Sequence, residues 1–403
     1  MYNRELATKL TELVKTFPVL TVTGPRQSGK TTLCRMTFPQ YGYVNLEDPV
    51  LRSEIAADVK TYLMQYSDGL IIDEAHYLPE IFSYVQVLVD EDKKRRFVLS
   101  GSSNFLMMHN ISQSLAGRAA VVRLLPLSVR ELTDIERYST DEIMLRGFFP
   151  AVWGNGSNPA DVYRSYYLTY LQRDVVQLIN VKDASAFQQF ITLCAARVGN
   201  EFVAQDLSNE TGISLPTVQS WFSVLEASYL AFRLQPYFRN IGKRLVKTPK
   251  LYFTDVGLAC FLLGIRTPEH LKNHPLRGAL FENMIVSEML KNRYNTGEES
   301  NLFFYRDKSK REVDLVETFG MQIKAYEIKS AKRYNPEFFK NLDYLRNIMG
   351  GDILSTQVVY DGDDNRDIPN NGIVNYRQLL KNSGFSSNAV PITAMSAPAE
   401  NNS

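Results

Sequence analysis

Along the first 130 residues, hydrophobic residues occur either with helical periodicity or in short apolar runs typical of buried strands. Over residues 5–17, the residues Leu6, Leu10, Leu13, Val14 and Phe17 fall on one face of a helix. Short apolar segments then alternate with helical patterns, at residues 19–23, 43–46, 70–73, 97–100 and 120–124. Buried strands that alternate with helices predict a parallel sheet covered on both faces. We therefore expect an α/β domain that ends near residue 130.

The rest of the chain shows other patterns. Residues 131–195 are helical in pattern and rich in aromatic side chains. Residues 201–230 predict two helices around a turn, in which Gly212 suits a left-handed conformation and Ser214 caps the second helix. From Gly278 on, a helix precedes strand-like segments at 302–306, 312–316 and 322–330, and the tail from Asn382 has a disordered composition.

Composition excludes some classes of protein. The 403 residues contain 45 basic and 44 acidic side chains, so the overall charge gives no argument for nucleic acid. Three widely spaced cysteines, Cys34, Cys194 and Cys260, predict neither a disulfide framework nor a metal site and favour a reducing compartment. The N-terminal residues lack the features of a signal peptide, and the longest apolar run (258–265) is too short to cross a membrane. We expect a cytoplasmic protein with no membrane partner.

A glycine-rich segment follows the first predicted strand. Residues 24–32 read GPRQSGKTT and match G-x-x-x-x-G-K-[ST] between a strand and a helix. The predicted nucleotide-binding residues are Gly24, Pro25, Arg26, Gln27, Ser28, Gly29, Lys30, Thr31 and Thr32. Backbone N–H groups of such a loop favour phosphate oxygens, while Lys30 reaches the β- and γ-phosphates and Thr31 offers its hydroxyl to Mg²⁺. The sequence therefore predicts a site for ATP and Mg²⁺.

Two adjacent acids end the strand at 70–73. Asp73 is predicted to hold Mg²⁺ through water and Glu74 to polarise the attacking water, a division of tasks that favours hydrolysis over phosphorylation of a second substrate. The alternative is a surface Asp-Glu pair after a core strand. The tetrapeptide DEAH that they begin is similar to that of DEAH-box helicases, but the phosphate loop departs from their glycine spacing. His76 is therefore expected to be structural.

The next apolar strand ends in small polar residues. If this strand lies between the phosphate-loop strand and the acidic strand, then Ser102, Ser103 or Asn104 faces the γ-phosphate, and we favour Asn104 as the catalytic residue that orients water. Arg118, in SLAGR, is a candidate arginine finger acting in cis or on a neighbouring subunit. It is equally well interpreted as a surface arginine at a helix C-terminus.

The helix-turn-helix pattern raises DNA as a partner. Gln219 and Ser220 would lie near a groove, with Arg239, Lys243 and Arg244 on phosphates. The second helix, however, contains no lysine or arginine. Protein contacts, or a lid on the ATPase, are the alternatives.

Four charged residues near the C-terminal end form a nuclease-like pattern. Glu327 and Lys329 are two apart on a predicted strand and share a face, and Asp314 lies on the preceding strand. Asp314, Glu327 and the helical Glu282 are predicted to bind a second divalent metal (Mg²⁺ or Mn²⁺), with Lys329 orienting or activating water. A solvated strand with the common E-x-K spacing is the alternative.

Taken along its length, the chain resembles a bacterial and archaeal family of AAA+-type ATPases. The resemblance covers about residues 1–380 and is carried by GPRQSGKTT, VNLEDP (44–49), LIIDEAH, LSGSSN, SLAGR, YLQRDV (170–175), LVKTPKLYFTDVGL (245–258), FEN (281–283), EVDLV and YEIK. It implies a P-loop ATPase domain, a winged-helix-like middle and a restriction-endonuclease-like C-terminal fold. It also supports Lys30, Thr31, Asp73 and Glu74 at ATP, and Glu282, Asp314, Glu327 and Lys329 at the second site.

The patterns and the resemblance together predict five parts. They are a P-loop AAA+-like domain (1–130), a helical lid or linker (131–195), a winged-helix-like domain (196–270), a nuclease-like domain (271–381) and a disordered tail (382–403). Our leading hypothesis is an ATPase that couples Mg²⁺-dependent ATP turnover to a DNA-directed module. The alternative is an ATP-controlled switch whose C-terminal domain is catalytically silent and mediates protein contacts. A homo-oligomer or a protein partner is compatible with either.

Overall fold

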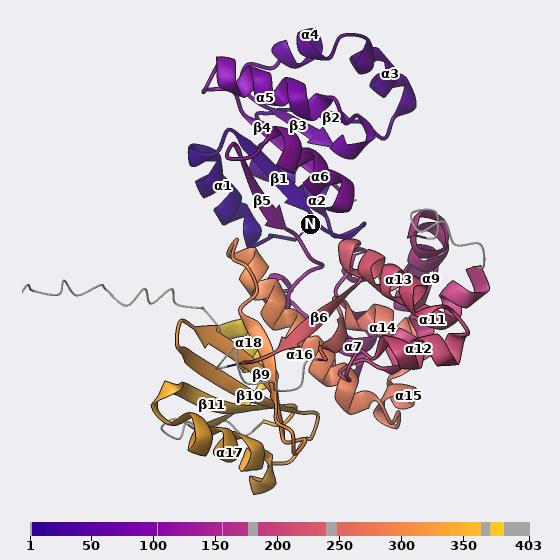
Figure 1. Ribbon diagram of the computed structural model, residues 1–403, viewed down its shortest axis with the longest axis vertical. Coiled ribbons are helices and arrows are strands. Elements are labelled where there is room, and N and C mark those ends of the chain that lie inside the picture. The colour runs from indigo at the N-terminus through magenta and orange to yellow at the C-terminus, as the bar shows by residue number, and fades with distance from the viewer. Residues whose placement is uncertain are drawn as a thin grey trace, which may run out of the picture.

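The computed structural model describes residues 2–102, 104–154, 156–175, 184–238, 248–363 and 371–382. Arg239, Lys243, Arg244, Ser103 and the predicted disordered tail beyond residue 382 lie outside the described residues. Figure 1 shows the N-terminal domain at the top, a helical unit at the lower right and a large sheet at the lower left.

The N-terminal domain is the predicted α/β layer structure. Its elements are α1 (Leu6–Thr16), β1 (Val19–Thr23), α2 (Lys30–Thr37), β2 (Gly42–Asn45), α3 (Pro49–Ala57), α4 (Val59–Met64), β3 (Leu70–Asp73), a 3₁₀ turn (Ala75–Tyr77), α5 (Ile81–Glu91), β4 (Phe97–Gly101), α6 (Asn104–Ser114) and β5 (Ala119–Arg123). All five strands are parallel, in the order β2-β3-β4-β1-β5. Every residue of β1, β3 and β4 is buried, as expected for central strands covered on both faces. The strand order confirms that β4 separates the phosphate-loop strand from the acidic strand.

A helical unit follows, as predicted for residues 131–195. It contains 3₁₀ turns at Val129–Glu131 and Ile135–Arg137, then α7 (Thr140–Arg146), α8 (Pro150–Trp153), α9 (Pro159–Tyr166), a π-helix (Tyr167–Val175) and α11 (Ala184–Ala196). The chain later returns to this unit with α14 (Val256–Leu262) and α15 (Pro268–Lys272). One hydrophobic core joins these helices to the C-terminal part of the molecule. No helix among the described residues is both long and apolar enough to cross a membrane.

The two helices and the turn expected near residue 212 are present. Helix α12 (Ala204–Thr211) ends at Gly212, whose φ of 71° is left-handed, and α13 (Leu215–Ala227) begins after Ser214. The Ser214 hydroxyl accepts a hydrogen bond from Thr217 N at 3.3 Å. Strands β6 (Ala231–Pro236) and β7 (Lys250–Phe253) then form an antiparallel hairpin. This arrangement agrees with a winged-helix outline, and that assignment stays a prediction.

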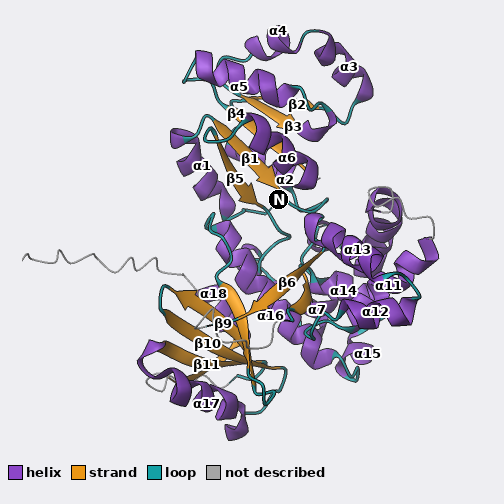
Figure 2. Ribbon diagram, in the orientation of Figure 1, coloured by secondary structure: helices purple, strands orange, loops and turns teal. Residues whose placement is uncertain are grey.

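The C-terminal part is a seven-stranded sheet with helices on its faces. It contains α16 (Arg277–Asn295), β8 (Leu302–Arg306), β9 (Glu312–Phe319), β10 (Gln322–Lys329), 3₁₀ turns at Pro336–Phe339 and Gly350–Asp352, α17 (Lys340–Met349), β11 (Ile353–Tyr360), β12 (Asn371–Asn375) and α18 (Tyr376–Asn382). The strand order is β12-β11-β10-β9-β8-β6-β7. Strand β6 pairs with β8 as well as β7, so the hairpin after α13 extends this sheet toward the helical unit (Figure 2).

Candidate functional site

The predicted phosphate loop connects β1 to α2 and depends on its two glycines. Gly24 has a φ of 149°, and a Cβ there would lie 2.1 Å from the Leu124 carbonyl oxygen. Gly29 has a φ of 92° and immediately precedes Lys30, the first residue of α2. Gln27 also adopts a positive φ, of 62°. The chain therefore turns sharply and forms a backbone cradle at the N-terminus of a helix, where phosphate oxygens are favoured.

Lys30 is folded over this cradle. Its ammonium donates to the carbonyl oxygens of Gly24 and Pro25, both at 2.9 Å, and the side chain is buried. Burial lowers the pKa of Lys30, against the opposing effect of the nearby Glu74 and Asp73 carboxylates. A buried ammonium held only by neutral carbonyls is poorly compensated, so an anionic phosphate is the ligand that this position favours.

Asp73 lies at the centre of a hydroxyl cluster beside the loop. Its Oδ2 accepts from Thr31 Oγ1 at 2.6 Å and from the Tyr43 hydroxyl at 3.1 Å, and its Oδ1 accepts from Ser100 Oγ. Burial, followed by the Asp73 charge, raises the pKa of Tyr43 to about 12. A carboxylate and a hydroxyl in contact at the phosphate loop are donors that Mg²⁺ accepts. The chain therefore fits Mg²⁺ at Thr31 and Asp73. Tyr43 and Ser100 were not identified from sequence patterns.

Glu74 is positioned by the end of the neighbouring strand. It adopts a left-handed conformation (φ 50°), and its Oε2 accepts from Ser102 N at 3.0 Å and from Ser102 Oγ at 3.1 Å. His76 Nδ1 lies 3.3 Å from the same oxygen, and burial lowers the pKa of His76. Of the three polar residues predicted after β4, Ser102 is thus beside the catalytic candidate. Asn104 begins α6, and its side chain is outside the described part of the structure.

Arg118 lies at the end of the strands opposite to the phosphate loop. Its carbonyl accepts from Val19 N at the start of β1, whereas the phosphate loop follows the end of β1. Five strand residues span about 16 Å, too far for the guanidinium to reach a nucleotide in its own chain. It pairs instead with Asp90, at 2.8 and 2.7 Å. This geometry weighs against a finger acting in cis, and a finger acting on a neighbouring subunit stays a prediction.

A buried arginine outside the motif supports the loop from behind. Arg4 Nη1 donates to the Ser28 carbonyl at 2.6 Å, Nη2 donates to the Leu125 carbonyl at 2.7 Å, and Nε lies 3.0 Å from Glu131 Oε1. One side chain thus links the phosphate loop to the segment that leaves β5.

We expect Arg4→Met to raise the KM for ATP about tenfold or more and to change kcat much less, because a charge-assisted hydrogen bond that fixes the loop is lost. Steady-state ATPase kinetics would measure both constants. Arg137→Met, at a residue whose side chain is 77% exposed, is the control. An unchanged KM in Arg4→Met would show that the contact does not position the loop.

Further contacts join the loop region to other parts of the molecule. The hydroxyls of Thr23, the last residue of β1, and Tyr229, just after α13, lie 2.8 Å apart and are buried. Tyr229 has a φ of 55°, unusual for a residue with a side chain. The Arg26 guanidinium lies 5.7 Å from the ring centre of Tyr170 in the π-helix. The nucleotide site is therefore in contact with both the helix-turn-helix and the helical unit.

The second predicted site does bring its four residues close together. Lys329 Nζ lies 2.7 Å from Glu327 Oε1 and 3.6 Å from Asp314 Oδ2. Burial, followed by the Asp314 charge, raises the pKa of Glu327 to about 8. Burial and the Asp314 charge also raise the pKa of Glu282, although Lys250 opposes them. The charge of Asp314 therefore acts on both Glu327 and Glu282, as expected for carboxylates that lie close together.

The structure does not support the prediction that Glu282, Asp314 and Glu327 bind a metal. Among the described residues, no three His, Cys, Asp or Glu side chains are arranged to hold a metal ion. The reason is visible in the contacts of Glu282: its Oε1 accepts from Lys250 Nζ at 2.7 Å and from the Tyr252 hydroxyl at 2.5 Å. Lysine ammonium groups therefore contact the carboxylate oxygens that a metal ion would need as ligands.

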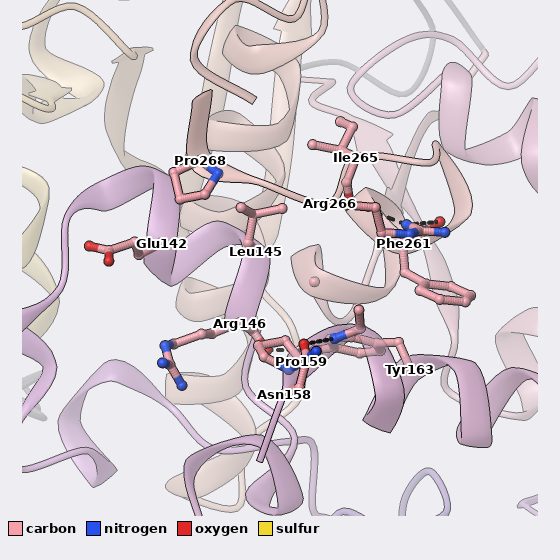
Figure 3. A pocket seen from close by; sticks show the side chains of 12 residues that line it. Glu142, Leu145, Arg146, Asn158, Pro159, Tyr163, Phe261, Ile265, Arg266 and Pro268 are labelled. Carbon is pink, nitrogen blue, oxygen red and sulfur yellow. Dashed lines mark hydrogen bonds between the residues drawn. The ribbon is translucent and has the colours of Figure 1, made fainter. Parts of the chain in front are cut away.

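A separate hollow of about 210 Å³ lies among α7, α9, α14 and α15. The residues that line it include Leu145, Tyr163, Phe261, Ile265, Arg146 and Arg266. Figure 3 shows the two guanidinium groups directed away from each other. They do not converge on a common anion, so this hollow is a weaker candidate than the phosphate loop.

The phosphate loop, the Thr31–Asp73 pair and the strand order define a P-loop ATPase domain. Three family models match successive parts of the chain. They are an AAA domain over residues 16–133, a domain of unknown function (DUF8612) over residues 137–269 and a domain of unknown function (DUF4143) over residues 277–379.

The chain belongs to the same AAA-domain family as the uncharacterized protein Rv2008c of Mycobacterium tuberculosis. The two are 31% identical over 333 residues, which cover 81% of this chain and 74% of the relative. The uncharacterized protein MJ1544 of Methanocaldococcus jannaschii is 24% identical over 327 residues, covering 73% and 70%. Among solved structures, the Walker-type ATPase PABY2304 of Pyrococcus abyssi matches 64% of this chain and 94% of its own, with 15% identity and a TM-score of 0.46. That score is too low to carry a structural argument.

Proposed function

We propose that this protein hydrolyses ATP with Mg²⁺ and that its nucleotide state controls the helix-turn-helix and the C-terminal sheet. The observation that carries the proposal is the buried contact between Thr23 and Tyr229. Thr23 immediately precedes the phosphate loop, and Tyr229 connects α13 to β6. A shift of the loop on nucleotide binding would therefore be transmitted directly to the strand that extends the C-terminal sheet.

The roles of the residues at the nucleotide follow from their chemistry. Lys30 neutralises charge on the phosphates, while Thr31 and Asp73 would hold Mg²⁺, which when bound stabilises negative charge on the transferred phosphoryl group. Glu74, held by Ser102, is the candidate base that orients and polarises water. Its carboxylate is anchored on one oxygen, which leaves the other available for water.

The experiment measures ATP turnover and hydrogen exchange on the full chain. We expect wild type to hydrolyse ATP with Mg²⁺, and Lys30→Ala to lose at least about 100-fold in kcat/KM. A non-hydrolysable ATP analogue with Mg²⁺ should change amide exchange in α13 and β6 of wild type and not of Lys30→Ala. Turnover without any exchange change beyond the N-terminal domain would contradict control by nucleotide and leave only the ATPase.

DNA is the second candidate target, favoured by the exposed Gln219 and Ser220 on α13 of the helix-turn-helix. The absence of lysine and arginine on α13 weighs against it. Fluorescence anisotropy with a labelled duplex at about 50 mM salt tests this, because phosphate contacts are strongest at low salt. If no binding appears there, and DNA does not stimulate ATP turnover, the target is a protein surface.

A further inference from the structure

The C-terminal sheet encloses a group of charges that we call the carboxylate centre. Its acids come from α16 and from strands β9 and β10, and its cations from β7 and β10. The members are Glu282, Glu312, Asp314, Glu327, Lys250 and Lys329. Four acids lie with these two lysines, and Arg306 Nε also lies 3.7 Å from Glu312 Oε2. Clustered carboxylate oxygens are the ligands to which a divalent cation would normally be recruited.

Lys250 is buried deep in the carboxylate centre and is only 2% exposed. Its ammonium lies 2.7 Å from Glu282 Oε1 and 2.8 Å from Glu312 Oε1. A lysine is almost never this buried unless it is paired, because removing an unpaired ammonium from water costs several kcal/mol. Lys250 therefore bridges helix α16 and strand β9 in the way that a bound metal ion would.

The remaining acids of the centre are also engaged. Asp314 Oδ2 accepts from Ile328 N at 2.7 Å and lies 3.6 Å from Lys329 Nζ, which donates to Glu327 at 2.7 Å. A divalent ion placed among these oxygens would stand beside an ammonium that already binds Glu282. Repulsion between the two cations in a buried setting is large, so the metal and Lys250 exclude each other.

We propose that Lys250 is the resident cation of the carboxylate centre, and that a divalent metal can enter only when Lys250 is withdrawn. Lys250 is the first residue of β7, in the hairpin that follows α13. Displacement of this hairpin would take the ammonium away from Glu282 and Glu312 together. The centre is thus closed to metal in the arrangement seen here. This inference concerns the C-terminal sheet alone and does not depend on ATP hydrolysis.

The test is Mn²⁺ binding to the nucleotide-free full chain, followed by electron paramagnetic resonance of free Mn²⁺. We expect Lys250→Met to bind one additional Mn²⁺ that wild type does not bind under the same conditions, a gain of at least about tenfold in affinity at the carboxylate centre, because one buried positive charge is removed from the site. The additional site should vanish in Lys250→Met combined with Asp314→Asn. Lys308→Met, which removes an exposed lysine near the same sheet, is the matched control and should behave as wild type.

Two results would overturn the proposal. One is a Mn²⁺ site in wild type that disappears in Asp314→Asn alone, since the centre would then bind metal with Lys250 in place. The other is a folded Lys250→Met protein that gains no Asp314-dependent site. If Lys250→Met does not fold, the comparison of wild type with Asp314→Asn still tests whether the centre is closed to metal, because equal Mn²⁺ binding by the two is the expected result.

Discussion

Replacing Glu74 with glutamine is expected to lower kcat for ATP hydrolysis by about 100- to 10,000-fold, the usual contribution of a positioned base. The amide keeps the shape of the side chain and can still accept from Ser102, whose N and Oγ lie 3.0 and 3.1 Å from Glu74 Oε2. It cannot take a proton from water. ATP affinity should therefore be retained, because Lys30 and the loop are untouched. Phosphate release measures kcat, and a fluorescent ATP analogue measures binding.

A matched variant separates the charge of Glu74 from general effects on the domain. Glu54→Gln removes an exposed carboxylate from α3 and should leave both kcat and binding unchanged. Wild-type turnover in Glu74→Gln would exclude Glu74 as the base. The polar residues at the end of β4 would then be the candidates for orienting water. A parallel loss of ATP affinity would instead indicate that Glu74 supports the loop.

The nucleotide site could be predicted where its chemistry is local in sequence. The loop from Gly24 to Thr31 and the Asp73–Glu74 pair follow strands that the apolar pattern identifies, and the strand order confirms the position of β4 between them. Arg4 could not be found this way. It is 24 residues from the Ser28 carbonyl that it contacts and 121 from that of Leu125, and no periodicity relates these segments.

At the C-terminal site, too, a residue distant in sequence could not be predicted, and here that residue changes the interpretation of the site. The two-residue spacing of Glu327 and Lys329 and the hairpin with β9 bring Lys329 beside Glu327 and Asp314. Lys250 lies in a different part of the sequence and reaches Glu282 through tertiary contacts. Strand β6 pairs with β8 and with β7, and Asn283 of α16 hydrogen-bonds the backbone of Phe253 in β7. A pattern of acids alone indicates a metal site, whereas the tertiary structure supplies a cation from the chain itself.

The largest effect on stability is expected at Asp255, which is fully buried where α14 packs against α7 and α9 in the helical unit. Its carboxylate accepts from the Tyr163 hydroxyl and Phe148 N, both at 2.6 Å, and from Leu258 N at 2.9 Å. Burial raises the pKa of Asp255, opposed first by the Lys291 charge. Asp255→Ala would leave two backbone N–H groups without this acceptor, remove a partner of the tyrosine and open a small cavity. We expect it to lower the free energy of unfolding by about 3–5 kcal/mol.

Urea denaturation followed by tryptophan fluorescence measures this loss in the right place. The two tryptophans, Trp153 and Trp221, both contact the core that contains Tyr163, and Trp153 Nε1 donates to the Gly147 carbonyl beside it at 2.8 Å. Asp58→Ala is the control, because Asp58 also caps a helix, by accepting from Thr61 N, but is exposed. Its effect should be much smaller, since water can replace the lost acceptor. Equal midpoints for the two variants would mean that the buried network relaxes around the missing carboxylate, so that Asp255 does not fix α14 against α7 and α9.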